Sequence, residues 1–391
     1  MYRRSVSHEI EKRLCEPRRF MQIVMGPRQT GKTTAVRQAL ESLGIPSVVF
    51  DAGSVLSTPT ARIAIEWEQA RMLAQREGKA VLFIDEAQKA AGWSDAVKAL
   101  WDEDSWNDVP LHVIVSGSSS LLIRKGLSDS LKGRFEVIRS TQWSLPEMES
   151  AFGFSLESFL LHGGYPGAAA LADDEQRWLS YIDDSIIEST LSNDILQLEN
   201  IRKPALIKRL FDLGSYYSGQ EMSYRKVLGQ LDDKGNTDVV AHYLDLLQGA
   251  GMLAGLQKFH PKEHVSRRSS PRFMVFDTAL MSAAWRDQAD LLLSSPEHRG
   301  RLVESAVGAS LLNRAAVERF ELRWWRDGDH EVDFVVRSGE RVTAIEVKSG
   351  RVKSLGGLEK FMERFPNARA LVIGGDANSL EDFLRGRVSL F

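Results

Sequence analysis

Short apolar runs alternate with amphipathic segments over the first third of the chain. The segments 60–77 and 94–101 have the spacing of helices with one buried face. The apolar runs between them have the length of buried strands and cover residues 20–25, 47–50, 80–84, 111–115 and 135–138. This alternation is typical of a parallel sheet covered by helices, so we predict an α/β fold with a five-stranded core.

The pattern changes near residue 152, where helical segments follow one another without strands until about residue 254. A Gly-Gly-Tyr-Pro sequence at 163–166 interrupts the chain near the start of this region. We then predict three successive helices, a strand and a basic loop, at 203–217, 224–231, 238–249, 251–256 and 258–272. This order outlines a winged helix-turn-helix, and a helix-rich linker is the alternative.

From about residue 273 strands and helices mix again. We predict a long helix at 300–317, a hairpin at 331–349, and then a helix and a strand up to residue 373. At 391 residues the chain is too long for one ordinary domain. We therefore expect an α/β core at 1–150, a helical lid at 151–200, a winged-helix-like region at 201–272 and a second α/β domain at 273–391.

Composition and charge exclude several classes of protein. A formal net charge of −3 excludes a polycation that coats nucleic acid, so contacts with DNA need local basic patches. A single cysteine, Cys15, excludes an internal disulfide framework and favours a reducing compartment. No apolar run has membrane-spanning length, and residues 1–18 are charged, unlike a signal sequence. The expected location is the cytoplasm, with no membrane partner.

The sequence Gly-Pro-Arg-Gln-Thr-Gly-Lys-Thr at 26–33 matches the pattern G-x-x-x-x-G-K-[ST] between a predicted strand and a predicted helix. Glycines let backbone N–H groups surround phosphates at the start of a helix, and a plain glycine-rich turn is the alternative. We expect Lys32 to meet the β- and γ-phosphates of ATP and the Thr33 hydroxyl to bind Mg²⁺. The predicted nucleotide site comprises Gly26, Pro27, Arg28, Gln29, Thr30, Gly31, Lys32, Thr33 and Thr34.

Two acidic residues follow the apolar run 81–84. The carboxylate of Asp85, at the carboxyl end of a buried strand, is expected to contact Mg²⁺. Glu86 is placed to orient and polarise the attacking water, which predicts hydrolysis of ATP in addition to binding. Such an acidic strand end is common in proteins, and it gains its meaning here from the phosphate-binding loop upstream.

Two further residues are candidates for catalysis. Ser116 ends another predicted strand, where its hydroxyl can sense the γ-phosphate or hold the water, and an ordinary turn serine is the alternative. Arg134 precedes the fifth strand, where an arginine can reach the γ-phosphate in a neighbouring subunit. A surface arginine without a catalytic role is the alternative for Arg134, and Arg124 is its nearest competitor.

Five sequence features together resemble one family. They are the loop at 26–33, the sequence Phe-Ile-Asp-Glu-Ala-Gln at 83–88, the segments 116–119 and 130–134, and the Gly-Gly-Tyr-Pro sequence. In this order they resemble bacterial and archaeal AAA+ ATPases that carry a C-terminal domain of the PD-(D/E)XK nuclease type. The resemblance implies a ring-forming hexamer with Arg134 as the arginine finger that acts on the neighbouring subunit.

The C-terminal hairpin carries a second constellation. Residues 331–336 and 341–348 alternate like strands, and a turn at Ser338 and Gly339 would place Asp333 opposite Ala344. We then expect Asp333 and Glu346 to bind Mg²⁺ beside Lys348, with Glu304 from the long helix as a fourth group. This pattern resembles that of PD-(D/E)XK nucleases, and a solvated, charged hairpin face is the alternative.

A basic stretch can neutralise phosphates without reading sequence, or simply form a solvated loop. It comprises Lys258, His260, Lys262, His264, Arg267, Arg268 and Arg272. Trp324 and Trp325, which follow each other in the sequence, are predicted to pack in the core rather than to stack on bases.

The preferred function is an oligomeric AAA+ ATPase that uses ATP and Mg²⁺ to bind, translocate on or remodel DNA, including branched or forked DNA, by structure rather than sequence. One alternative is a metal-dependent DNA nuclease gated by its ATPase. Another is a remodeller of a protein partner whose nuclease-like domain is inactive. Intact Asp333, Glu346 and Lys348 argue mildly against the last.

Overall fold

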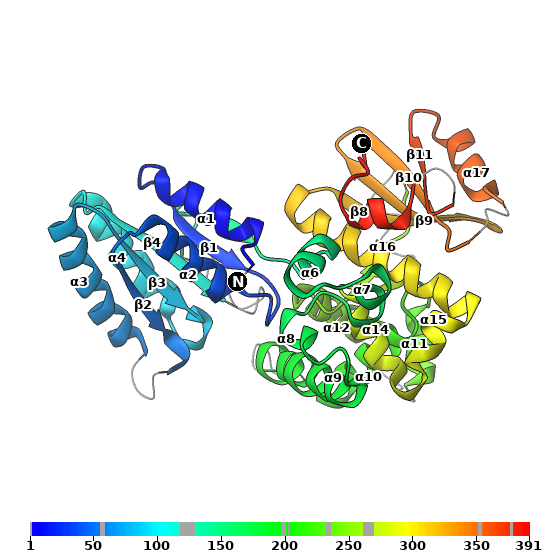
Figure 1. Ribbon diagram of the computed structural model, residues 1–391, viewed down its shortest axis with the longest axis horizontal. Coiled ribbons are helices and arrows are strands. Elements are labelled where there is room, and N and C mark those ends of the chain that lie inside the picture. The colour runs from blue at the N-terminus through cyan, green and yellow to red at the C-terminus, as the bar shows by residue number, and fades with distance from the viewer. Residues whose placement is uncertain are drawn as a thin grey trace. The chain divides into compact units, whose positions relative to one another are not determined.

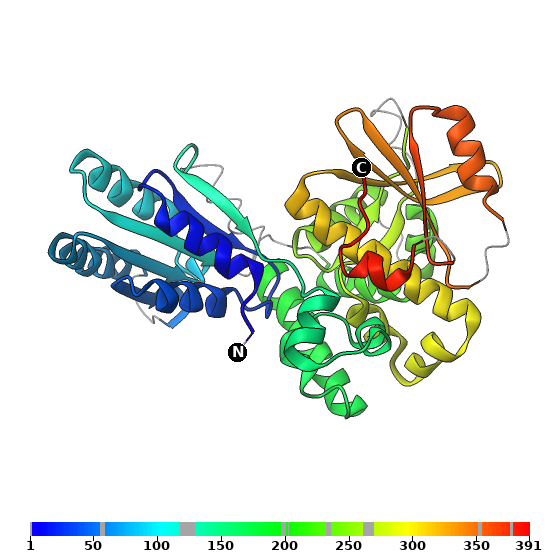
Figure 2. The ribbon, with the colours of Figure 1, turned by 45° about the horizontal axis from the view of Figure 1, so that its top comes forward.

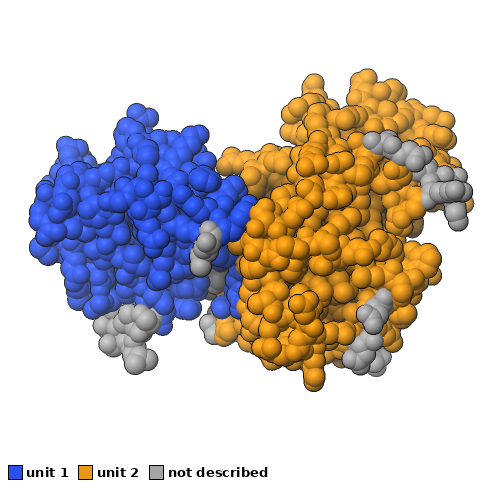
Figure 3. All heavy atoms as spheres, in the orientation of Figure 1, with its two compact units in different colours: residues 1–141 blue, residues 142–391 orange. Residues whose placement is uncertain are grey.

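The computed structural model describes residues 2–54, 59–117, 130–196, 201, 203–231, 236–260, 270–350, 354–375 and 378–391. The chain divides into two compact units, residues 1–141 and 142–391 (Figure 3). Among the described residues, no helix combines the length and the apolar character needed to cross a membrane.

Unit 1 is built on a parallel five-stranded sheet (Figure 1). Its strand order is β2 (Ser47–Asp51), β3 (Ala80–Asp85), β4 (Leu111–Gly117), β1 (Met21–Met25) and β5 (Phe135–Arg139), and every neighbouring pair is parallel. The five strands predicted from the apolar runs are thus confirmed, as is the α/β fold. Strands β1, β3 and β4 are buried along their whole length, because helices cover both faces of the sheet.

The two faces of the sheet pack against different helices. On one face, α3 (Pro59–Glu77) and α4 (Trp93–Trp106) cover alternate strand residues such as Leu82 and Ile84. On the other face, α1 (Ser5–Cys15) and α2 (Lys32–Leu43) cover Val81 and Phe83. Helix α1 lies within the charged N-terminal segment and buries Ile10 and Leu14, which the sequence reasoning had not assigned to a helix.

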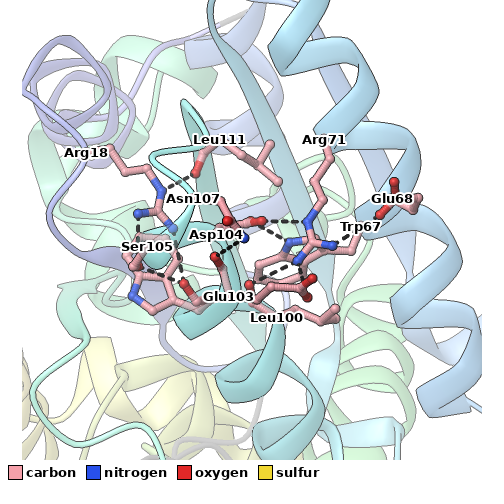
Figure 4. A network of polar contacts seen from close by, with 11 residues as sticks. Arg18, Trp67, Glu68, Arg71, Leu100, Glu103, Asp104, Ser105, Asn107 and Leu111 are labelled. Atoms are coloured by element: carbon pink, nitrogen blue, oxygen red, sulfur yellow. Dashed lines mark hydrogen bonds and ion pairs between the residues drawn. The ribbon is translucent and has the colours of Figure 1, made fainter.

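A buried carboxylate joins α3 to α4 (Figure 4). Asp104 on α4 accepts hydrogen bonds from Trp67 Nε1 at 2.7 Å and from Arg71 Nε at 2.5 Å, both on α3. Next to it, the Arg18 guanidinium lies 3.7 Å from the Trp101 ring centroid. Two donors offset the cost of burying the Asp104 carboxylate, so the network fixes these helices on the sheet.

The described residues between 142 and 252 of unit 2 form helices and no strand, as predicted. They are α6 (Leu145–Phe152), α7 (Leu156–His162), α8 (Pro166–Ala169), α9 (Glu175–Tyr181), the π-helical segments Ile182–Glu188 and Leu191–Ile195, α10 (Pro204–Tyr216), α11 (Tyr224–Gln230) and α12 (Thr237–Gly249). Strands β6 (Leu253–Leu256) and β7 (Arg272–Val275) follow and pair antiparallel. The three predicted helices before the basic stretch are therefore confirmed, while 261–269 lies outside the described residues.

The Gly-Gly-Tyr-Pro sequence is a packing point as well as a chain break. The backbone N–H of Gly164 donates to Asp277 Oδ2 at 2.9 Å. A Cβ on Gly163 would lie 1.7 Å from Asp277 Oδ1, and the φ of Gly163 is 67°, so only glycine fits. Burial raises the pKa of Asp277 to about 7, although backbone N–H donors oppose the shift. Asp277 also caps α14 (Thr278–Trp285) by accepting from Ala279 N.

The last part of unit 2 holds a four-stranded sheet in the order β11 (Arg369–Ile373), β10 (Arg341–Val347), β9 (His330–Ser338) and β8 (Glu321–Asp327). The helices here are α15 (Ala289–Ser294), α16 (Pro296–Glu318), α17 (Gly356–Arg364) and α18 (Leu380–Leu384) (Figure 2). Strand β8 was not predicted, but it carries Trp324 and Trp325, whose predicted place in the core is confirmed.

The register of the predicted hairpin was wrong. Arg341 pairs with Ser338, so the two turn residues are Gly339 and Glu340. Ala344 therefore lies opposite Val335 and not opposite Asp333. Gly339 has a φ of 62°, a conformation that glycine adopts readily, which explains why the turn sits one residue further along.

Candidate functional site

The loop between β1 and α2 has the backbone of an anion-binding loop. Gln29 and Gly31 have φ values of 58° and 82°, and such left-handed residues in a short loop are typical of the backbone concavities that bind anions. A Cβ on Gly26 would lie 1.7 Å from the carbonyl oxygen of Ser140, so only glycine fits there. Lys32 and Thr33 open α2, where the helix dipole favours an anion.

The Lys32 side chain is held inside this loop. Only 6% of Lys32 is exposed, and its ammonium donates to the Pro27 carbonyl oxygen at 2.7 Å. The Thr30 hydroxyl donates to the same oxygen at 3.1 Å. The ammonium of Lys32, which the sequence predicts to bind phosphate, therefore lies within the loop and contacts its backbone.

Asp85 brings three predicted site residues together. Its Oδ2 accepts from the Thr33 hydroxyl at 2.6 Å, and its Oδ1 accepts from the Ser116 hydroxyl. Two of the predicted site residues, Thr33 and Ser116, thus contact the same carboxylate. Ser116 is fully buried inside β4, so it is not a turn serine. The carboxyl ends of β3 and β4 and the start of α2 thus meet at one point.

Glu86 follows Asp85 in a left-handed conformation with a φ of 52°. Its Oε2 accepts from Gln88 Nε2 at 2.8 Å and lies 3.6 Å from the ammonium of Lys89. A left-handed φ is uncommon for a residue with a side chain and concentrates at functional sites. The geometry turns the chain sharply after β3 and leaves the Glu86 carboxylate at the same sheet edge as Asp85.

Arg134 lies at the opposite edge of the sheet. It precedes β5, whose first residue pairs with Met21 at the amino end of β1, whereas the phosphate-binding loop follows the carboxyl end of β1. Its Nε and Nη2 donate to the two carboxylate oxygens of Asp102 at 2.6 and 2.9 Å. Arg134 thus lies at the other end of the sheet from the loop at 26–33 of its own chain. Arg124, Ser118 and Ser119 lie outside the described residues.

In unit 2 two of the carboxylates predicted to bind metal, Glu304 and Asp333, lie next to the side chain of an arginine, Arg272. Nη1 of Arg272 lies 3.1 Å from Glu304 Oε1 and 3.6 Å from Asp333 Oδ1, while its Nη2 pairs with Glu331. Lys348 donates to Glu346 Oε1 at 2.6 Å. Only 4% of Arg272 is exposed, so its predicted place in an exposed basic stretch was wrong: it is a buried ion-pair partner in β7.

Burial dominates the electrostatics of this cluster. It raises the pKa of Glu304 to about 8 and that of Glu346 to about 7, with the nearby charge of Asp333 adding to both shifts. Arg272 opposes both shifts, and Glu346 Oε2 is buried without a hydrogen-bond partner. Over the described ranges, no group of three or more His, Cys, Asp or Glu side chains is arranged to hold a metal ion.

The third helix of the predicted winged-helix region has an acidic exposed face. Its exposed residues include Asp238, His242, Asp245 and Gln248. The exposed basic residues Arg225 and Lys226 lie instead on α11. Contacts with phosphates are therefore favoured at α11 over α12.

Sequence reasoning missed two buried arginines. Arg272 starts the apolar run 272–276, and a cation at the head of a buried strand is a usable signal for a buried ion pair. Arg4 is 5% exposed and contacts the phosphate-binding loop, but it stands in a charged segment where no sequence pattern distinguishes it.

Comparison with protein families divides the chain in three. Residues 18–149 match an AAA domain, residues 153–291 a domain of unknown function (DUF8612), and residues 299–384 another domain of unknown function (DUF4143). An uncharacterized protein of Methanocaldococcus jannaschii, MJ1544, is 25% identical over 285 residues, which cover 68% of this chain and 60% of that protein. The chain thus spans about three fifths of the length of this relative.

Among solved structures, the chain is similar to the RuvB Holliday junction branch migration motor of Thermotoga maritima, with a TM-score of 0.34, 18% identity and coverage of 63% of this chain and 89% of that one. It is also similar to the ORC1 protein of Aeropyrum pernix in complex with DNA, with a TM-score of 0.32, 14% identity and coverage of 74% and 93%.

Proposed function

We propose that unit 1 binds ATP with Mg²⁺ and hydrolyses it. The observation that carries the proposal is the meeting of Thr33, Asp85 and Ser116 beside the loop that holds Lys32. Oxygen ligands at the start of a helix, next to the backbone N–H groups of the loop, suit a metal-bound triphosphate. The AAA domain matched by residues 18–149 supports this reading.

Each residue has a distinct task in this proposal. The N–H groups of the loop and the Lys32 ammonium hold the phosphates, while Thr33 and Asp85 hold the metal directly or through water. Magnesium neutralises developing charge on the phosphate oxygens when it is bound. Glu86 orients and polarises the attacking water, and Ser116 keeps Asp85 in place through its buried hydrogen bond.

Substituting Lys32 with Ala is expected to raise the Kd for ATP about 10- to 100-fold, because charge-assisted hydrogen bonds to phosphate are lost. Titration calorimetry with ATP and Mg²⁺ measures this change. Lys12→Ala, at an exposed position on α1, is the matched control and should bind ATP like the unaltered chain. Binding and hydrolysis that survive Lys32→Ala unchanged would remove the basis of the proposal.

We further propose that ATP turnover is coupled to DNA binding, translocation or remodelling, including that of branched or forked DNA, in a homo-oligomeric, hexameric ring. Arg134 would act there on the nucleotide of a neighbouring chain, exchanging Asp102 for phosphate oxygens. Its position at the sheet edge opposite its own phosphate-binding loop supports an action between chains. In this proposal residues 151–200 form the lid, residues 201–272 the winged-helix-like region and residues 273–391 the nuclease-like domain.

The ATPase rate is expected to rise with some members of a panel of single-stranded, duplex, forked and four-way DNA, and to fall back with salt. Lys226→Ala, on the exposed basic part of α11, should weaken this stimulation, whereas Lys360→Ala on α17 should not. A rate that no DNA alters would count against DNA and in favour of a protein partner.

Remodelling of a protein partner is the second candidate, and the acidic exposed face of α12 favours it, since this face repels phosphates. A metal-dependent nuclease gated by ATP is disfavoured. The guanidinium of Arg272 lies among the carboxylates that would hold the metal and supplies the positive charge there.

A further inference from the structure

The side chain of Arg4 contacts the backbone of the phosphate-binding loop. It precedes α1, is 5% exposed, and its Nη1 lies 2.9 Å from the carbonyl oxygen of Thr30. The same atom lies 3.1 Å from Ser140 Oγ and 3.0 Å from the carbonyl oxygen of Thr141. A single buried guanidinium thus joins the loop to the segment that follows β5 and ends unit 1.

The contact with Thr30 fixes the direction of one peptide unit. The C=O of Thr30 and the N–H of Gly31 belong to the same planar trans peptide, so they point in opposite directions. Since the carbonyl is turned toward Arg4, the N–H of Gly31 is turned away from it. Gly31 is the residue directly before Lys32, and its φ of 82° is one that glycine adopts readily, so this φ alone does not hold the peptide in place.

Other contacts between the same two segments make this arrangement rigid. The Thr30 and Ser140 hydroxyls lie 3.2 Å apart, and Ser140 N donates to the Met25 carbonyl at 2.7 Å. The Ser140 carbonyl fills the space that a side chain at Gly26 would need. The loop therefore rests on Ser140 at both ends, and Arg4 is the charged group in this contact.

We infer that Arg4 is a positioning residue for nucleotide binding: it aims the Gly31 N–H at the phosphates by holding the Thr30 carbonyl. This inference rests on the proposed binding of ATP by the loop. A backbone N–H that contacts phosphate equally in the bound ground state and in the transition state contributes to affinity and not to kcat.

Arg4→Ala is therefore expected to raise the KM for ATP about 10- to 100-fold, the worth of one hydrogen bond to a charged group, with kcat unchanged. The Kd for Mg-ADP, measured by calorimetry without turnover, should rise by the same factor. A merely structural role would instead lower the folded fraction, and thus the apparent kcat, with the KM and the Kd for Mg-ADP unchanged. That second pattern, or no change at all, would overturn the inference.

Three further variants sharpen the test. Arg4→Lys keeps the charge but loses the planar fork, so it should restore part of the affinity. Ser140→Ala loses the hydroxyl contact with Thr30 but keeps the contact of Arg4 with the Thr30 carbonyl, so it should raise the KM less than Arg4→Ala. Arg3→Ala removes the neighbouring arginine, which pairs with Glu11, and should leave the KM unchanged. If the unaltered chain bound no ATP the proposed function would fail, whereas normal binding by Arg4→Ala would overturn this inference alone.

Discussion

Replacing Glu86 with Gln is expected to lower the kcat for ATP hydrolysis about 100- to 10,000-fold, the range that general acid–base groups contribute. The Kd for ATP should stay unchanged, because Glu86 lies beyond the loop that holds the phosphates. Glutamine keeps the size of the side chain but cannot polarise water as a carboxylate does. A phosphate-release assay and ATP calorimetry on the same preparation measure both quantities.

The control for this variant is Glu41→Gln on the exposed surface of α2, which changes net charge equally and should leave kcat unchanged. Loss of ATP binding together with hydrolysis would show that Glu86 supports the loop rather than the water. A kcat within a factor of a few of the unaltered value would assign the water to another group. Ser116 would then be the next candidate, because it lies at the same carboxyl edge.

The sequence predicted unit 1 well because its signals are local. Each buried strand is a continuous apolar run in the sequence. The spacing of Gly26, Lys32 and Thr33 matches the pattern that is typical of a phosphate-binding loop. The contact of Thr33 with Asp85 then follows, since β1 and β3 are parallel strands of one sheet, separated only by β4, and end at the same edge.

Unit 2 was predicted less well because its key contacts join distant segments. Arg272, Glu304 and Asp333 belong to three different elements, β7, α16 and β9. The periodicity of a sequence does not indicate which cation pairs with a given carboxylate. The hairpin register depended on whether Ser338 or Glu340 forms the turn together with Gly339. The alternation of apolar and polar residues along the two strands does not distinguish these two turn positions, which differ by one residue. The burial of Arg4 could not be predicted for the same reason, because its partners Thr30 and Ser140 lie far from it in the sequence.

Arg272→Ala is expected to lower the free energy of unfolding by about 3–5 kcal/mol at neutral pH, because removing one partner of a buried ion pair leaves the others uncompensated. Glu304, Asp333 and Glu331 would lose their shared cation. Denaturant unfolding monitored by tryptophan fluorescence is a suitable measurement, since Trp324 lies 5.3 Å from the guanidinium and reports on this region.

The matched control is Arg326→Ala. Arg326 pairs with Glu221 and also with Glu331, but its side chain is 43% exposed, so the loss should be within about 1 kcal/mol. Equal costs for the two variants would mean that Arg272 is not the principal cation of the cluster.

The cost of Arg272→Ala should also grow with pH. Glu304 and Glu346 ordinarily have a pKa of 4.5, and burial raises these values in the folded chain to about 8 and about 7. Between those limits the folded state binds more protons than the unfolded state, so the free energy of unfolding falls as pH rises. Without Arg272, which lowers both values, the folded pKa of each group moves further up and the fall continues to higher pH. Unfolding measured at pH 5 and pH 8 should therefore show the smaller loss at pH 5, whereas a loss independent of pH would mean that Arg272 acts by packing rather than by charge.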